Sequence, residues 1–231
     1  MLLCSIKESC TRCILCLKEL FKLPRHRMTR ENHLMKVSAQ EAHEATNALE
    51  KLRCLILTKG YDSVLQFGKL MRRREREDNH TVTRDEMRAI ITEYGVEFSD
   101  HEVDDLFSSF DKADMGAINC EEFLIKLRPE MSDARKHVVE EAFNKLADSE
   151  DGVISIEDMK HKFDASRHPK VLSKESTEHD TLMNFVANFE GGVHDDGKVT
   201  KEEFMDYYSG VSKSIGDDEY FTTVVQNKWI L

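Results

Sequence analysis

The stretch Asp111-Lys-Ala-Asp-Met-Gly116-Ala-Ile-Asn-Cys-Glu-Glu122 decides the fold. Counted from its first residue, it has an acid at position 1, glycine at 6, isoleucine at 8, asparagine at 9 and glutamate at 12. Oxygen ligands at positions 1, 9 and 12 and a glycine for the turn at 6 are typical of a calcium-binding loop between two helices. The predicted ligands are therefore Asp111, Asn119 and Glu122. Positions 3 and 5 are alanine and methionine, whose side chains offer no oxygen.

Two later stretches repeat this outline with other ligands missing. Residues 147–158 have alanine at position 1, and their predicted ligands are Ser149, Asp151, Ser155 and Asp158. Residues 192–203 have glycine and histidine at positions 1 and 3, and an enlarged loop starting at Glu190 is an alternative. Their predicted ligands are Asp196, the backbone carbonyl of Lys198, Thr200 and Glu203.

An earlier stretch, residues 75–86, completes a set of four. Its ligand positions hold Glu75, Glu77, Asn79, Thr83 and Glu86. His80 stands at position 6, so we expect it to adopt the left-handed conformation that glycine adopts without steric cost. The four stretches, loops 1 to 4, begin at residues 75, 111, 147 and 192, and a repeat of this length indicates an array of one helix–loop–helix unit.

These repeats predict an all-α protein of two EF-hand pairs, in the calmodulin-like superfamily. Within each pair, short β contacts should join Val82 to Ile118 and Ile154 to Val199. Each missing carboxylate removes a ligand and a charge, the two quantities that tune affinity. We therefore predict weak Ca²⁺ binding, at or beyond about 10⁻⁵ M, in loop 3 or loop 4. The alternative is that the hands are architecture without a useful calcium site.

The predicted domains are an extension and linker at 1–40, a first lobe at 41–129 and a second lobe at 130–231. Pro24 should end any N-terminal helix, with Arg25 to Lys36 as a polar linker. Residues 165–177 should form a polar connection, and Pro129 should separate the lobes. The expected helices cover about 42–59, 61–74, 84–94, 100–110, 120–127, 132–146, 156–164, 178–189, 201–209 and 217–228. The last of them, which carries Phe221, either docks in a groove of the protein or simply completes its core.

The bulk composition indicates a globular protein that does not bind nucleic acid. The chain has 231 residues, of which 40% are hydrophobic and 33% charged, and a net charge of −11. Residues 1–60 hold 11 basic and 6 acidic side chains, whereas the remainder holds 22 and 38, and an acidic body repels phosphates. No stretch approaches the roughly 18 apolar residues of a membrane span. The early charges of Lys7 and Glu8 argue against a signal peptide, so we expect a cytoplasmic protein with free thiols.

The basic N-terminal segment carries Cys4, Cys10, Cys13 and Cys16. This spacing allows zinc or an iron–sulfur cluster, but reversible S-acylation of Cys10, Cys13 and Cys16 fits better, because they recur every three residues beside basic side chains. Acylation would bring the segment into peripheral contact with a membrane. Unmodified thiols are the commonest outcome for such a segment. Leu2 in place of glycine excludes N-myristoylation.

Segments outside the loops resemble calcyphosin and its calcyphosin-like relatives. They are Leu52-Arg-Cys-Leu55, Leu127-Arg-Pro-Glu-Met-Ser132, Ala142-Phe-Asn-Lys-Leu146, His168-Pro-Lys170, Asp206-Tyr-Tyr-Ser-Gly-Val-Ser212 and Lys228-Trp-Ile-Leu231. The resemblance implies two EF-hand pairs, calcium binding, no catalysis and a cytoplasmic or ciliary setting. The chain departs from the family at Glu75, Ala113, Met115, Ala147 and Glu190.

Two functions follow as hypotheses. The first is a calcium-modulated adaptor whose protein partner is an amphipathic helix or a cytoskeletal component. The second is a calcium-independent scaffold of a ciliary or other cytoskeletal assembly. No phosphate-cradling glycine loop or nucleophile motif is present in the sequence, so we expect no enzymatic activity.

Overall fold

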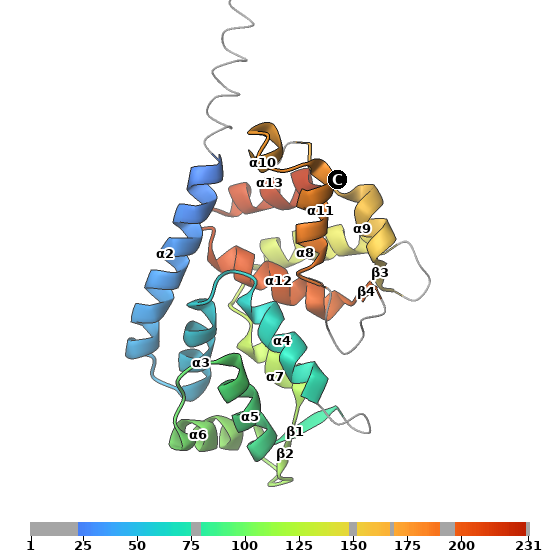
Figure 1. The fold of residues 1–231 in the computed structure, drawn as a ribbon. Helices are drawn as coiled ribbons and strands as arrows, with labels where there is room; N and C mark the ends of the chain where they lie inside the picture. Colours follow the sequence, from blue (N-terminus) through green and yellow to red (C-terminus); the bar gives the residue numbers. More distant parts are fainter. Residues whose placement is uncertain (1–22, 75–79, 148–151, 167–168, 190–196, 230–231) are drawn as a thin grey trace, which may run out of the picture.

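The computed structural model describes residues 23–74, 80–147, 152–166, 169–189 and 197–229. Its elements form two lobes stacked along one long helix, α2 (Leu23–Glu44), as Figure 1 shows. The first lobe contains α3 (Ala48–Leu57), α4 (Ser63–Arg74), β1 (Thr81–Thr83), α5 (Arg84–Tyr94), α6 (Asp100–Phe110), β2 (Ala117–Asn119) and α7 (Cys120–Leu127). The second contains α8 (Asp133–Leu146), β3 (Ile154–Ser155), α9 (Ile156–Lys162), α10 (Pro169–Leu172), α11 (Glu178–Val186), β4 (Lys198–Val199), α12 (Lys201–Lys213) and α13 (Asp218–Trp229).

The predicted all-α fold and both β contacts are confirmed. Val82 in β1 lies opposite Ile118 in β2, and Ile154 in β3 lies opposite Val199 in β4, each pair antiparallel. Helices α5, α6 and α7 begin and end at the predicted residues. The start of each helix is fixed by neighbouring residues, because a polar side chain such as Ser99 accepts the N–H of the residue three positions later.

The predicted polar linker at 25–36 is wrong, since these residues lie within α2. Pro24 stands beside the first residue of the described helix, and proline is tolerated in a first turn. Leu34, Ser38 and Ala42, spaced four apart, are buried and form one stripe on α2. Because two of the three are small and one is polar, this stripe gives almost no hydrophobic signal, although helix α2 packs along α3.

Other predicted boundaries also need correction, and one of them is the end predicted at 209, since α12 runs on to Lys213. The single helix expected at 42–59 is two helices, because Asn47 accepts the N–H of Glu50 and caps the start of α3. Helix α3 ends at Leu57, and Gly60 in the turn after it has a φ of 125° that favours glycine. The polar connection at 165–177 contains the short helix α10.

Among the described helices, none is apolar over the length that crossing a membrane would take.

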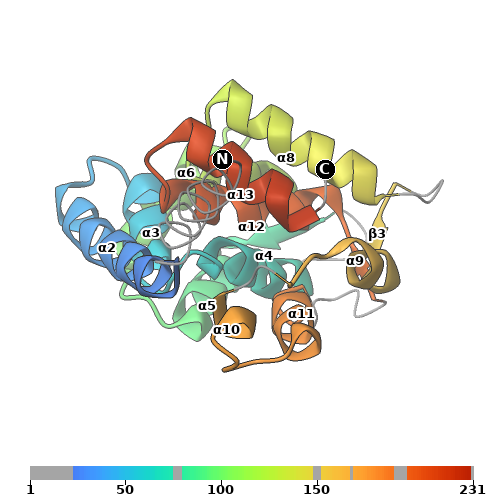
Figure 2. The same cartoon turned by 90° about the horizontal axis from the view of Figure 1, so that it is seen from above.

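Helix α4 contributes side chains to both hydrophobic cores. Val64 and Phe67 belong to the core of the first lobe, whereas Leu65 packs in the core of the second. Figure 2 shows α4 lying beneath α12 when the molecule is seen from above. The contact is close, since a Cβ added at Gly210 in α12 would lie 1.8 Å from the carbonyl oxygen of Tyr61. The lobes therefore form one packed body.

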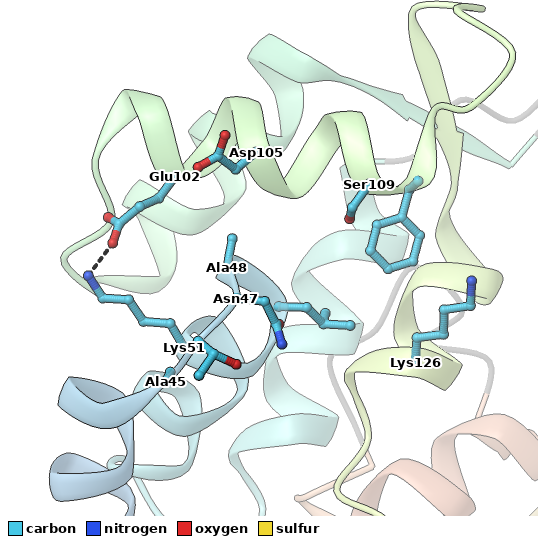
Figure 3. Close-up of a pocket in the computed structure, with 11 residues that line it drawn as sticks. Ala45, Asn47, Ala48, Lys51, Glu102, Asp105, Ser109 and Lys126 are labelled. Atoms are coloured by element: carbon cyan, nitrogen blue, oxygen red, sulfur yellow. Dashed lines mark hydrogen bonds and ion pairs between the residues drawn. The ribbon is translucent and has the colours of Figure 1, made fainter.

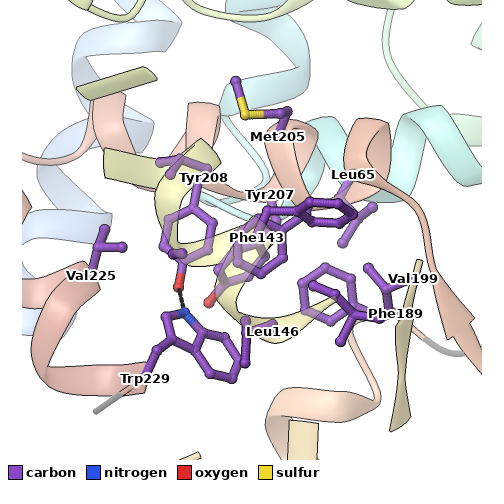
Figure 4. Close-up of a cluster of buried hydrophobic side chains, with 14 of the residues drawn as sticks. Leu65, Phe143, Leu146, Phe189, Val199, Met205, Tyr207, Tyr208, Val225 and Trp229 are labelled. Atoms are coloured by element: carbon purple, nitrogen blue, oxygen red, sulfur yellow. Dashed lines mark hydrogen bonds between the residues drawn. The ribbon is translucent and has the colours of Figure 1, made fainter. Parts of the chain in front are cut away.

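Each lobe is filled by a helix from outside its hands. Helix α3 places Leu52 and Ile56, both 0% exposed, in the first core. Helix α13 places Phe221, Val225 and Trp229 in the second core. The indole Nε1 of Trp229 donates a hydrogen bond of 2.7 Å to the hydroxyl of Tyr208, as Figure 4 shows. The C-terminal helix thus completes the second core.

Candidate metal centre

Loop 2 (residues 111–122) is described from end to end, and Asp111 organises it. The Asp111 carboxylate accepts the backbone N–H of Met115 at 2.8 Å and of Gly116 at 2.7 Å, which pulls the loop around it. Gly116 has a φ of 68°, as the sharp turn at position 6 requires. Asn119 accepts the N–H of Glu122 at 2.9 Å and caps α7. Side-chain hydrogen bonds to the backbone therefore order both ends of loop 2, at Asp111 and at Asn119.

Position 6 adopts the same conformation in all four loops. The φ angle is 68° at Gly152 and 69° at Gly197. His80 has a φ of 52°, so the left-handed turn predicted for this histidine is confirmed. This conformation is uncommon for a residue with a Cβ and carries a steric cost there.

In loops 1, 3 and 4 the carboxylate at position 12 is held by the residue at position 9. Glu203 accepts the N–H of Thr200 at 3.0 Å and its hydroxyl at 3.2 Å, and the same box joins Asp158 to Ser155 and Glu86 to Thr83. These boxes cap α12, α9 and α5. A metal ion at any of these loops would have to draw the carboxylate out of its box.

Glu122 differs from the other residues at position 12. It is exposed, whereas Glu86 and Asp158 are half-buried and Glu203 is only 9% exposed. Its helix is capped by Asn119, an amide, in place of the Ser or Thr hydroxyl of the other loops. Within the described part of the chain, no three His, Cys, Asp or Glu side chains already converge as a preformed metal site. Binding at loop 2 therefore needs a turn of the Glu122 side chain toward Asp111.

Several predicted site residues lie outside the described residues. They are Ser149 and Asp151 in loop 3, Asp196 in loop 4, and Cys4, Cys10, Cys13 and Cys16 in the N-terminal segment. Lys198, whose backbone carbonyl is the predicted ligand at position 7, lies in β4 with an exposed side chain. The placement of a calcium site in loop 3 or loop 4 therefore stays a prediction.

A buried ion cluster lies between the lobes, and no local pattern in the sequence points to it. Asp206 in α12 is 0% exposed and accepts hydrogen bonds from Arg72 in α4 at 2.9 Å and from Arg128 at the end of α7 at 2.6 Å. Burial raises the pKa of Asp206, and the two guanidinium groups oppose that rise. Burial of Arg128 acts to lower its pKa, but its contacts with Asp206 and Glu202 outweigh burial and raise the pKa. This arginine therefore stays charged.

A cleft of about 640 Å³ lies beside the start of α3. Figure 3 shows the residues that line it. It opens between α3 and the two helices of the second hand, α6 and α7. Lys51 of α3 pairs with Glu102 of α6 at its rim, and Arg53 of α3 donates to the carbonyl of Leu127 at 2.8 Å. Helix α3 therefore holds both helices that flank loop 2.

Comparison with known proteins agrees with this architecture. The model of an EF-hand domain pair matches residues 78–127. The chain is 43% identical over 199 residues to crustacean calcium-binding protein 23 of Faxonius limosus. The aligned stretch covers 86% of this chain and 98% of the relative. It is 36% identical over 168 residues to crustacean calcium-binding protein 23 of Homarus americanus, which covers 73% of this chain and 99% of the relative.

Proposed function

The chain belongs to the EF-hand family that includes crustacean calcium-binding protein 23, and we propose that it binds Ca²⁺ weakly as a non-catalytic, calcium-modulated regulator. The names of the relatives support Ca²⁺ as the ion, in agreement with the loop pattern. The observation that carries the proposal is loop 2, where Asp111 already shapes the turn and the Glu122 carboxylate is exposed. Calcium takes six to eight oxygen ligands, and this loop supplies carboxylates at both ends of the cage.

The affinity should be low because the middle of the loop 2 cage lacks ligands. Ala113 and Met115 occupy positions 3 and 5, and the Met115 side chain is 77% exposed. Water would have to replace these two side chains as ligands. We therefore expect a dissociation constant of about 10⁻⁵ M or weaker, at or beyond the limit of the calcium sensors.

Calcium would regulate the protein by shifting the helices that follow the loops. In loops 1, 3 and 4 the carboxylate at position 12 also caps the following helix, so its transfer to an ion would release that helix start. The grooves that EF-hand sensors open on binding calcium are filled here by α3 and α13. A partner helix would therefore have to compete with one of these two helices, and an amphipathic helix is the fitting chemistry.

The test is a calcium titration of the full chain by calorimetry, after chelation and with magnesium present. We expect heat of binding with a midpoint of tens of micromolar or above, and a loss of the loop 2 component in Glu122→Gln. Glu93→Gln, which removes only an exposed ion pair with Arg74, is the matched control and should titrate like the wild type. Absence of heat up to millimolar calcium would contradict the proposal.

A calcium-independent scaffold is the second candidate, and the self-filled grooves favour it. With α3 and α13 in place, the fold needs no ion to bury its apolar surface. On this reading the chain keeps its melting temperature in chelator, and calcium adds no apolar dye binding. A ciliary or other cytoskeletal assembly and the calcyphosin-like affiliation belong to this proposal as predictions. A large rise in melting temperature with calcium would exclude it.

A further inference from the structure

The ion cluster of Arg72, Asp206 and Arg128 joins the two helices that leave loops 2 and 4. Asp206 lies on α12, three residues after Glu203, the last residue of loop 4. Arg128 directly follows α7, the helix that leaves loop 2, and Arg72 lies on α4. Because the Asp206 side chain is 0% exposed, its hydrogen bonds to the two arginines have no solvent alternative.

The outer arms of the cluster end beside the predicted calcium ligands. Arg72 Nε donates to Oε1 of Glu121 at 2.7 Å, and Arg128 Nη2 donates to Oε2 of Glu202 at 2.5 Å. Glu121 is position 11 of loop 2 and Glu202 is position 11 of loop 4. Each therefore directly precedes the carboxylate at position 12. A displacement of α7 at Glu122 acts on Glu121 and through Arg72 on Asp206.

Helices α4 and α12 pack closely around the cluster, so neither helix can shift there without moving the other. A Cβ added at Gly68 would lie 3.0 Å from both Arg72 Nη1 and Asp206 Oδ2. Helix α4 also holds the turn that follows α11, the helix that enters loop 4, since Lys69 Nζ donates to the carbonyl of Asn188 at 2.5 Å. Close-packed contacts of this kind shift as units between discrete arrangements.

We propose that calcium binding at loop 2 is transmitted through Arg72 and Asp206 to helix α12 of the second lobe. This inference rests on the proposed calcium binding and adds the route of regulation. The coupling is reciprocal, so a change at α12 alters calcium affinity at loop 2 by the same factor. Through the cluster, the hands that contain loops 2 and 4 therefore change conformation together when calcium binds at loop 2.

Trp229 provides a reporter for α12. It is the only tryptophan in the sequence, and it donates to Tyr208, two residues beyond Asp206 on the same helix. The background for the test is the triple variant Glu86→Gln, Asp158→Asn and Glu203→Gln. It removes the carboxylate at position 12 from loops 1, 3 and 4 while keeping a side chain that can cap. In this background calcium at loop 2 should change Trp229 emission with the midpoint that calorimetry gives.

Adding Asp206→Asn to the background should abolish the emission change while the calcium heat remains. If this variant does not fold, Glu121→Gln provides the second route, because the Glu121 side chain is 37% exposed and its loss cuts only the arm from α7. Glu93→Gln, in the same lobe but outside the cluster, is the control and should leave the emission change intact.

The outcomes separate the two proposals. Calcium heat in the background without any emission change, or an emission change that survives both Asp206→Asn and Glu121→Gln, overturns the coupling and leaves calcium binding standing. Heat in the wild type that vanishes in the background places no site at loop 2 and also overturns the coupling. No heat in the wild type overturns calcium binding and the coupling together.

Discussion

Nη2 of Arg72 lies 2.9 Å from Oδ2 of Asp206, and the two residues, 134 positions apart, come from different lobes. The carboxylate is fully buried and the arginine side chain is 10% exposed. A charge pair this far from water is costly to break on one side, because the remaining charge loses both its partner and its solvent. The union of the two lobes therefore depends on polar contacts as well as on apolar packing.

Asp206→Ala should destabilise the fold by about 3–5 kcal/mol, because it removes the buried carboxylate that two guanidinium groups share and leaves each with one partly exposed partner, Glu121 or Glu202. Urea unfolding followed by Trp229 emission measures the change. The control Glu93→Gln breaks a pair whose two side chains are 44% and 41% exposed, and it should cost less than about 1 kcal/mol. Equal costs for the two variants would show that the buried cluster has no special weight.

Gly210→Ala should destabilise the protein although alanine is the better helix former. The added Cβ would lie 1.8 Å from the carbonyl oxygen of Tyr61, so α12 must move away from the turn before α4. We expect a net cost of about 1–3 kcal/mol by thermal or urea unfolding. Gly216→Ala is the matched control, because nothing lies within 4 Å of its added Cβ. An unchanged stability for Gly210→Ala would contradict the close approach of the two lobes.

Trp229→Phe should cost about 1–3 kcal/mol through its lost hydrogen bond alone, since it leaves the buried hydroxyl of Tyr208 without its indole donor. The added variant Tyr208→Phe removes that hydroxyl as well. Unfolding of the two single variants and the double variant forms a cycle, and the double variant should be more stable than the summed single costs predict. Additive costs would mean that the hydrogen bond contributes nothing.

Glu102 should make stability depend on pH in the acid range. Partial burial acts to raise its pKa, but hydrogen bonds from Lys51 and from Ser99 outweigh it and lower the pKa to about 2. A carboxylate with a depressed pKa stabilises the fold above its unfolded value, about 4.3, and this contribution is lost as the pH falls toward 2. NMR titration of the Glu102 carboxyl measures the pKa directly.

The control for Glu102 is its partner. Lys51→Met should bring the pKa of Glu102 back up toward its ordinary value, while the capping hydrogen bonds from Ser99 remain. The side chain of Glu102 is 25% exposed, so the effect on overall stability should be small even where the pKa shift is clear. An unchanged pKa in Lys51→Met would assign the shift to the cap alone.

The elements predicted correctly depend on neighbours within a few residues. The starts of α5 and α12 follow from Thr83 with Glu86 and from Thr200 with Glu203, a pattern readable as a capping box. The same boxes explain what the loop pattern did not show, that these carboxylates are engaged by their own helices. The predicted linker failed for the opposite reason, because α2 is held by burial against α3.

The sequence by itself determined the hands: the four loops, the left-handed position 6 in each, the antiparallel β contacts and the helices between them. These features rest on hydrogen bonds and turns closed by nearby residues. Only the tertiary structure decided that α4 is shared by two cores, that α3 and α13 complete those cores, and that Asp206 meets Arg72 and Arg128. Such contacts depend on which surfaces exclude water together, and residues 78 and 134 positions apart carry no local sign of that choice.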